Sequence, residues 1–136
     1  MTSKVYIYKR VVQSKLFIDA HYSEAIDLDN IAGEAYFSKF HFIRLFKSIY
    51  GKTPHQYLIS VRVEQSKLLL QKGLTVTQSC TEVGFESLTS FTALFKKYVR
   101  LSPSEYQRIY LAREEQIRTA PLEFIPACFA SQYGWN

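Results

Sequence analysis

The residues best suited to binding chemistry are basic side chains in two short segments. Arg44 and Lys47 lie in the first segment, and Lys96 and Lys97 lie in the second, with Lys96 placed 49 residues after Lys47. An arginine fork can bind O6 and N7 of guanine together, whereas lysine suits phosphate oxygens. These cations indicate a polyanion as partner, with nucleic acid as the leading candidate.

The charge of the whole chain agrees with this interpretation without deciding it. The 136 residues carry 17 basic and 12 acidic side chains, a net charge of +5. Residues 1–112 hold fifteen basic and nine acidic residues, whereas residues 113–136 hold two and three. A basic compact part favours a polyanion, but many soluble proteins are equally basic, so charge alone leaves both readings open.

Residues that serve catalysis or metal binding elsewhere lack the required spacing here. The histidines are scattered at His21, His41 and His55, and two cysteines, Cys80 and Cys128, are too few for a zinc site or a disulfide framework. No phosphate loop or hydrolase motif occurs. We therefore expect no catalytic residue, no metal and no cofactor, and no enzyme. No apolar run reaches about 18 residues, so we expect a cytoplasmic protein that does not contact a membrane.

Apolar residues recur at helical spacing throughout the chain, and no segment alternates like a strand, so the predicted class is all-α. Expected helices cover residues 5–22, 54–72 and 103–112, with helical pairs at 27–50 and 76–99. Thr53, Thr75 and Ser102 begin capping boxes, Ser38 and Ser87 are caps, and Gly51 and Gly73 are stops. The expected buried stripes are Val5, Tyr8, Val12, Leu16 and Ile18; Leu28, Ile31, Ala32 and Ala35; Phe42, Leu45, Phe46 and Ile49; and Phe91, Leu94, Phe95 and Tyr98.

The two helical pairs form an internal repeat. Phe42, Leu45, Phe46, Lys47, Pro54 and Tyr57 recur 49 residues later as Phe91, Leu94, Phe95, Lys96, Pro103 and Tyr106. Upstream of the turns the offset is 48, so one residue has been inserted at the second turn. A short helix, a tight turn and a second amphipathic helix make a helix-turn-helix, whose second helix can enter a major groove. Two copies are too few for a stable solenoid.

With these motifs, residues 10–110 resemble the DNA-binding domain of the AraC/XylS family of transcription regulators. The matching segments are 35–47 (AYFSKFHFIRLFK), 51–57 (GKTPHQY), 83–87 (VGFES), Phe91, 95–98 (FKKY) and 101–106 (LSPSEY). The resemblance implies about seven helices, with two helix-turn-helix subdomains joined by a long central helix. It also implies two recognition helices that enter adjacent major-groove segments of double-stranded DNA.

Three residues depart from the family pattern. Tyr36 occupies a turn position that often holds glycine, so a positive φ is expected there. Ser79 replaces a usual apolar residue, which would loosen the second subdomain. Ala93 stands where relatives often have arginine and matches Arg44 in the repeat. We therefore expect the first recognition helix to supply most of the sequence specificity and the second helix mainly to anchor the protein.

The candidate DNA-binding residues lie on the recognition helices, away from the expected core stripes. In the first helix they are Ser38, Lys39, Phe40, Ile43, Arg44 and Lys47; in the second they are Ser87, Leu88, Thr89, Ser90, Thr92, Lys96 and Lys97. Arg44 is the candidate for guanine, with a solvated surface arginine as the alternative. Phe40 and Ile43 are candidates for thymine methyl groups, and for Phe40 peripheral core packing is an equal alternative. Lys96 and Lys97 suit phosphates.

We assign residues 1–112 to an AraC-type DNA-binding domain and residues 113–136 to a C-terminal extension of unknown role. The extension is apolar and broken by prolines, so folding back onto the domain, contacting a partner such as RNA polymerase, and disorder all stay open. As a single domain the protein is expected to be monomeric. The leading functional hypothesis is sequence-specific transcription control. The alternative is a protein-interaction module that keeps the fold without specific DNA binding.

Overall fold

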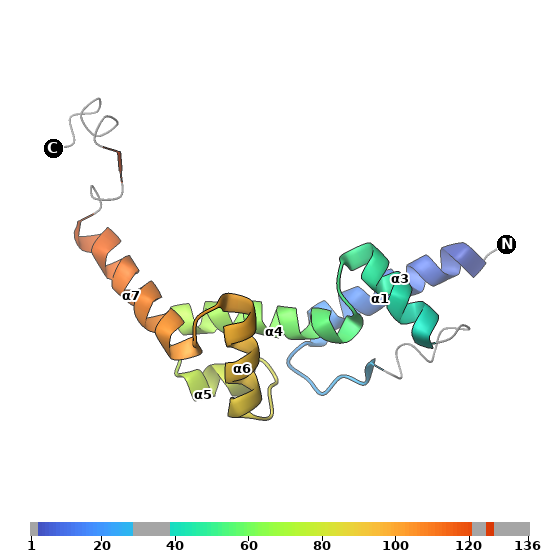
Figure 1. Ribbon diagram of the computed structural model, residues 1–136, viewed down its shortest axis with the longest axis horizontal. Helices are drawn as coiled ribbons and strands as arrows, with labels where there is room; N and C mark the ends of the chain where they lie inside the picture. The colour runs from blue at the N-terminus through green and yellow to red at the C-terminus, as the bar shows by residue number, and fades with distance from the viewer. Residues whose placement is uncertain (1–2, 29–38, 121–124, 127–136) are drawn as a thin grey trace.

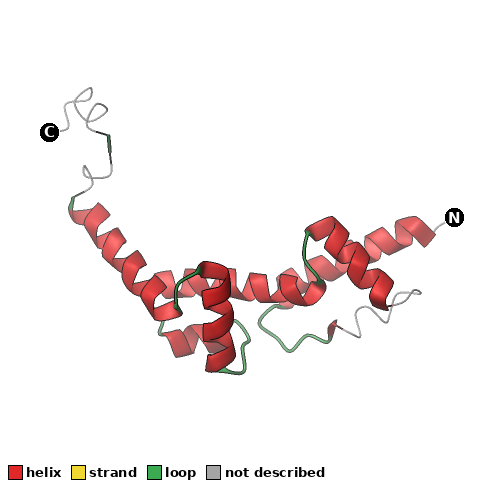
Figure 2. Cartoon of the chain, viewed as in Figure 1, coloured by secondary structure: helices red, strands yellow, loops and turns green. Residues whose placement is uncertain are grey.

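The computed structural model describes residues 3–28, 39–120 and 125–126, and this part of the chain is helical with no strand (Figure 2). Its six helices are α1 (Ser3–His21), α3 (Lys39–Tyr50), α4 (Pro54–Gln71), α5 (Val76–Glu82), α6 (Leu88–Val99) and α7 (Pro103–Thr119). The all-α prediction is confirmed. The predicted cap at Ser38 and the predicted positive φ of Tyr36 fall outside the described residues.

Local side-chain chemistry explains where these helices begin. Three starts are capping boxes, in which a hydroxyl accepts from the amide of the third helical residue and that residue's side chain accepts from the cap amide. The pairs are Thr53 with Gln56, Thr75 with Gln78, and Ser102 with Glu105. Ser87 caps α6 by accepting from the amide of Ser90. These four starts confirm the predicted caps at Thr53, Thr75, Ser87 and Ser102.

Helices α3 and α6, the predicted recognition helices, also end alike. Gly51 follows α3 with φ 76°, and Arg100 follows α6 with φ 73°. These residues are 49 positions apart, so the repeat extends to the left-handed residue that stops each helix. Glycine adopts this conformation readily, whereas arginine pays a steric penalty from its Cβ.

Helix α4 is the axis of the molecule, with α1 and α3 around one end and α5, α6 and α7 around the other (Figure 1). Each end has its own hydrophobic core. The first core consists of Val11, Ile18, Phe42, Phe46 and Leu58. The second consists of Ile59, Val63, Leu70, Cys80, Val83, Phe85, Phe91 and Phe95. Because α4 contributes to both cores, it joins two units that are each packed separately; we call them the first and second units.

The predicted stripe of α1 is wrong except for Ile18. Val5, Tyr8, Val12 and Leu16 are exposed, and the buried face instead carries Val11, Ser14 and Ile18. Apolar residues surround this helix, so several stripes have helical spacing and only packing selects one. A serine is tolerated in the buried face because its hydroxyl donates to the carbonyl of Arg10 at 2.9 Å.

The last position of each recognition-helix stripe is also predicted wrongly. Ile49 is 40% exposed and Tyr98 is 38% exposed. Their sequence neighbours Tyr50 and Val99 pack against the first and second cores instead. The core-facing positions therefore follow a four-residue step, from Phe42 to Phe46 to the half-buried Tyr50, and Phe91, Phe95 and Val99 repeat this step in the second unit.

Helix α7 runs to Thr119, beyond the predicted end near residue 112. Neither proline nor glycine interrupts residues 104–120, and Arg118 pairs with Glu115 one turn earlier at 2.5 Å. The helix therefore continues past the point where the family resemblance stops, and its last turns are exposed.

Candidate nucleic-acid interface

Aromatic contacts fix each recognition helix against the helix that follows it. In the first unit the rings of Phe46 and Tyr57 meet edge to face, with centroids 5.9 Å apart and planes at 64°. In the second unit Phe95 and Tyr106 meet the same way, at 5.6 Å and 67°. Edge-to-face pairs are favourable and directional. The repeated pair holds α3 and α6 in equivalent positions within their units.

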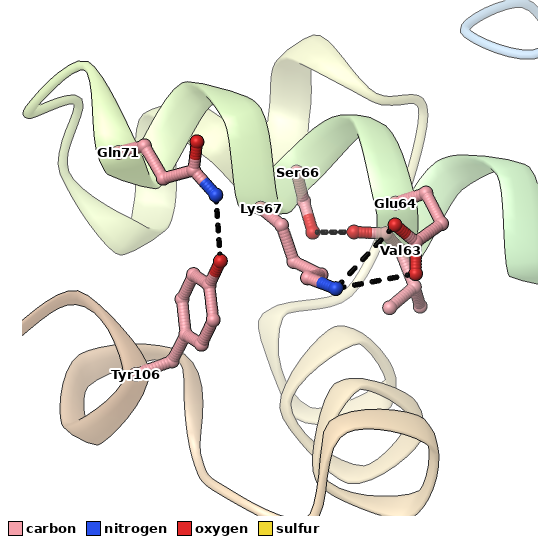
Figure 3. A network of polar contacts seen from close by, with 6 residues as sticks. All are labelled: Val63, Glu64, Ser66, Lys67, Gln71 and Tyr106. Carbon is pink, nitrogen blue, oxygen red and sulfur yellow. Dashed lines mark hydrogen bonds and ion pairs between the residues drawn. The ribbon is translucent and has the colours of Figure 1, made fainter. Parts of the chain in front are cut away.

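The hydroxyl groups of these two tyrosines are tied to other helices. Tyr57 donates to the carboxylate of Asp19 on α1 at 2.5 Å, and Lys15 pairs with the same carboxylate at 2.7 Å. Burial and the hydrogen bond to Asp19 raise the pKa of Tyr57. Tyr106 accepts from the amide nitrogen of Gln71 on α4 at 2.7 Å (Figure 3).

The same close-up shows how α4 supports the second unit. The ammonium of Lys67 lies 3.3 Å from the carboxylate of Glu64 and 5.9 Å from the ring centroid of Tyr106 (Figure 3). The hydroxyl of Ser66 is buried and donates to the carbonyl of Val63 at 2.6 Å. Polar groups on this part of α4 are thus paired, and Tyr106 connects them to the base of α7.

On α3, most of the predicted contact residues are exposed. Lys39, Arg44 and Lys47 lie on the surface, and Phe40 is 72% exposed, so it does not pack into the core. Ile43 differs because it is half-buried and packs against the first core. Ser38, also predicted to contact DNA, lies outside the described residues.

On α6, the exposed members of the predicted set surround the first turn and the last. Ser87, Thr89 and Ser90 are exposed, and Leu88 is 46% exposed. Thr92 is half-buried. Lys96 and Lys97 are exposed near the end of the helix. The Ser87 hydroxyl already accepts from the Ser90 amide, so this serine also has a structural role.

The recognition helices are basic without compensation from their own residues. Helix α3 carries Lys39, Arg44 and Lys47, α6 carries Lys96 and Lys97, and neither contains an aspartate or glutamate. The charge of Lys96 reaches the start of α7, where it helps lower the pKa of Glu105; hydrogen bonds from Ser102 are the larger cause. An exposed basic helix without acidic residues is suited to a phosphate-lined groove.

The two helices are presented together. In the view of Figure 1 both helices rise from their first turns, α3 beyond one end of α4 and α6 across α4 itself. A cleft lies between their first turns, lined by Lys39 and Ile43 of α3, Ser87 and Ser90 of the second unit, and Arg62 of α4. The first turns of α3 and α6 therefore border one concave surface.

Two residues bordering this cleft escaped the sequence analysis. Arg62 donates hydrogen bonds to backbone carbonyls of the first unit, and Gly84 lies so close to the backbone of Ser23 that an added Cβ would clash with it. Arginine between two valines within an apolar-periodic helix was a signal for a half-buried cation. The contact of Gly84 joins residues 61 positions apart, so no local pattern predicts it.

Within the described ranges, no group of three or more histidine, cysteine, aspartate or glutamate residues could hold a metal ion. In that same part of the chain, no helix has the length and apolar character needed to cross a membrane.

Comparison with known protein families shows which family has this arrangement of helices. Residues 31–109 match the model of a helix-turn-helix domain, and that segment contains α3, α4, α5 and α6 whole. The chain belongs to this family, of the AraC type. A family relative, an uncharacterised HTH-type transcriptional regulator of Pseudoalteromonas carrageenovora, is 33% identical over 108 residues, which are 79% of this chain and 64% of that protein. The probable transcription factor PqrA of Proteus vulgaris is 33% identical over 86 residues, which are 62% of this chain and 70% of that protein.

Other family relatives are longer than the shared part. The regulator YdeC of Bacillus subtilis is 34% identical over 101 residues, yet the match spans only 35% of its length. The chain thus spans between about a third and two thirds of the first relatives compared.

Solved structures show the same arrangement of helices. The DNA-binding domain of AdpA, solved in complex with a target DNA, is 31% identical with a TM-score of 0.72, covering 78% of this chain and 96% of that one. The C-terminal domain of AraT from Geobacillus stearothermophilus is 25% identical with a TM-score of 0.67, covering 74% and 84%.

Proposed function

We propose that this protein is a sequence-specific DNA-binding transcription regulator that inserts α3 and α6 into adjacent major-groove segments. The observation that carries the proposal is the pair of equivalent basic helices, α3 and α6. Neither contains an acidic residue, and each packs against its own hydrophobic core. The similarity to the DNA-binding domain of AdpA, which was solved in complex with a target DNA, supports DNA as the partner.

The exposed side chains support a division of work between the helices. Arg44 is exposed on α3, and its counterpart in the repeat is Ala93, which has no hydrogen-bonding side chain. The second helix offers hydroxyls near its start and two lysines near its end. We assign base recognition chiefly to Arg44 and phosphate contacts to Lys96 and Lys97, because bidentate arginine discriminates bases and lysine does not.

Selection of bound duplexes from a random library, followed by affinity measurements on variants, tests this proposal. Arg44→Ala is expected to weaken the selected duplex by about 5- to 150-fold, the range that corresponds to about 1–3 kcal/mol for one bidentate contact. Arg118→Ala is the matched control, because it removes an equal charge from an exposed position on α7.

Both variants should bind a shuffled duplex with similar small losses, since phosphate attraction depends on charge and not on sequence. If Arg44→Ala keeps the affinity for the selected duplex while Thr89→Ala abolishes it, the assignment of base recognition to the first helix is wrong. If no sequence is enriched, the proposed function itself is wrong.

A further inference from the structure

A backbone contact joins the two units beside α4. A Cβ added to Gly84, in the turn before α6, would lie 2.8 Å from the carbonyl oxygen of Ser23 and 3.0 Å from its carbonyl carbon. Gly84 also has φ +95°. The turn of the second unit therefore packs directly against the segment that follows α1 in the first unit, with no room for a side chain at this position.

Arg62 closes the same contact from α4. Its Nε donates to the carbonyl of Tyr22 at 2.6 Å, and its Nη2 donates to the carbonyl of Glu24 at 2.9 Å. The guanidinium lies 5.7 Å from the ring centroid of Phe85 in the second unit. One side chain thus binds the first unit through two hydrogen bonds and the second through a cation–π contact.

Tyr22 completes the connection. Its ring packs against both hydrophobic cores, and its hydroxyl lies 3.5 Å from the side-chain oxygen of Gln65 on α4. Arg62 is half-buried, and this burial lowers the pKa of its guanidinium against a raising effect from the charge of Glu86. We name Tyr22, Ser23, Arg62, Gly84 and Phe85 the inter-unit junction.

We propose that the inter-unit junction is a positioning device that fixes the angle between α3 and α6 and thereby sets the spacing of the two DNA segments the protein recognises. This inference rests on the proposed function. Arg62 and Gly84 act through the recognition helices and contact no base themselves.

Leverage explains why a small contact has a large effect. The two helices are expected to meet DNA about one helical turn apart, roughly 34 Å. Over that distance, a rotation of about 6° moves one helix by about 3.4 Å, the rise of one base pair. Packing of each unit on α4 tolerates side-chain adjustments, so a second bridge between the units is needed to hold the angle this closely.

The first test measures the angle without DNA. Nitroxide labels at Ser48→Cys on α3 and Ser104→Cys on α7 report the distance between the units by pulsed electron resonance, with Cys80 and Cys128 replaced by serine and alanine respectively and the unsubstituted junction as reference. Both label sites are exposed and lie outside the proposed contact set.

Gly84→Ala is the test variant and Gly73→Ala its matched control. Gly73 has nearly the same φ, +93°, but an added Cβ there meets nothing within 4 Å. The two variants therefore share the backbone penalty and differ in the clash with Ser23. We expect Gly84→Ala to shift or broaden the distance distribution and Gly73→Ala to leave it unchanged. Identical distributions for the two variants would overturn the inference.

Arg62→Lys gives a second variant with its charge retained and its fork removed. It is expected to broaden the distance distribution while the total helical content of the protein, measured by circular dichroism, stays the same. An unchanged distance distribution in folded Arg62→Lys protein would remove Arg62 from the inter-unit junction.

The second test uses DNA. The duplex selected by the unsubstituted protein is remade with one base pair inserted or deleted between its two recognised segments, and each segment is also tested alone. We expect the unsubstituted protein and Gly73→Ala to lose about tenfold or more on each change of spacing. Gly84→Ala and Arg62→Lys should bind the original duplex about tenfold more weakly and show little spacing preference, while the affinities for single segments stay the same.

The outcomes separate the two proposals. If selection succeeds but Gly84→Ala keeps the spacing preference of Gly73→Ala, the junction inference fails and the proposed function stands. If the selected duplex contains a single recognised segment, the junction inference fails because only one helix is used. If no duplex is enriched, the proposed function fails, and the inference built on it fails as well.

Discussion

Replacing Phe46 by alanine should unfold the first unit while leaving the second intact. Phe46 is fully buried, and its ring lies 4.9 Å from Tyr50, 5.9 Å from Tyr57 and 6.2 Å from Phe42, measured between centroids. The substitution therefore removes the ring around which the aromatic part of the first core is built.

The expected cost follows from the size of this ring and of the unit. Burying an aromatic side chain removes about 150–250 Å² from water, worth about 4–6 kcal/mol at about 25 cal/mol per Å². Measured Phe→Ala substitutions cost about 3–5 kcal/mol. A unit of about 50 residues has only about 2.5–7.5 kcal/mol of stability at typical values per residue. The loss is thus comparable to the whole stability of the first unit.

Amide hydrogen exchange measures this prediction helix by helix. In Phe46→Ala protein, amides of α1 and α3 should lose protection, whereas those of α5 and α6 should keep it. Phe95→Ala is the matched variant, because Phe95 is also fully buried and lies 49 residues later. It should show the reverse pattern. Equal loss of protection in both units by both variants would refute the division into two separately packed cores.

Three further predictions concern single positions. Arg100→Gly should raise the free energy of unfolding by about 0.5–1 kcal/mol, because relief of left-handed backbone strain exceeds the entropy cost of glycine. Gly51→Ala, at the equivalent position, should lower the free energy of unfolding. Chemical denaturation tests both variants, and a lower unfolding free energy for Arg100→Gly would contradict the strain argument. Ser79→Ala should stabilise the protein by about 1 kcal/mol, because the buried Ser79 hydroxyl has no hydrogen-bond partner in the described part of the chain, and a lower melting temperature would show that it does. Hydrogen bonds from Ser102 lower the pKa of Glu105, so the stability they add is present above the ordinary glutamate pKa and is lost as the pH falls through the lowered pKa. Ser102→Ala should therefore make the free energy of unfolding less dependent on acid pH. An unaltered profile of unfolding free energy against pH would exclude this contribution.

Much of this fold was predictable because its signals are local and occur twice. The spacing of Phe42, Phe46 and Tyr57 recurs in the second unit, and the capping hydroxyls mark helix starts without reference to the rest of the chain. Both kinds of signal depend on residues a few positions apart, so a sequence displays them directly.

The prediction errors arose where packing between segments distant in the sequence decides which face of a helix is buried. Helix α1 has apolar residues on several faces, and contact with the first core selects the face of Val11 and Ile18 over that of Val12 and Leu16. Sequence reasoning likewise placed Ile43 on the DNA side, although the core takes up part of that side chain.

The exposed charges of the candidate site could be predicted from the sequence, but the placement of α3 relative to α6 could not. Arg44 and the two lysines of α6 are recognisable because they fall off the apolar stripe of a helix. The contact between Gly84 and Ser23 is invisible until both units are folded, yet it governs how the charged helices are presented together. Sequence thus predicts which groups meet DNA, and tertiary structure determines the relative placement of those groups.

The most direct test of sequence-specific recognition is the affinity of the unsubstituted protein for its selected duplex and for a shuffled duplex of equal length, over a series of salt concentrations. Both affinities should fall with salt, by a logarithmic slope of about 0.9 for each phosphate neutralised. The selected duplex should remain about 10³-fold or more tighter near physiological salt, the lower range for specific recognition. Equal affinities for the two duplexes across the series would contradict recognition of sequence by α3 and α6.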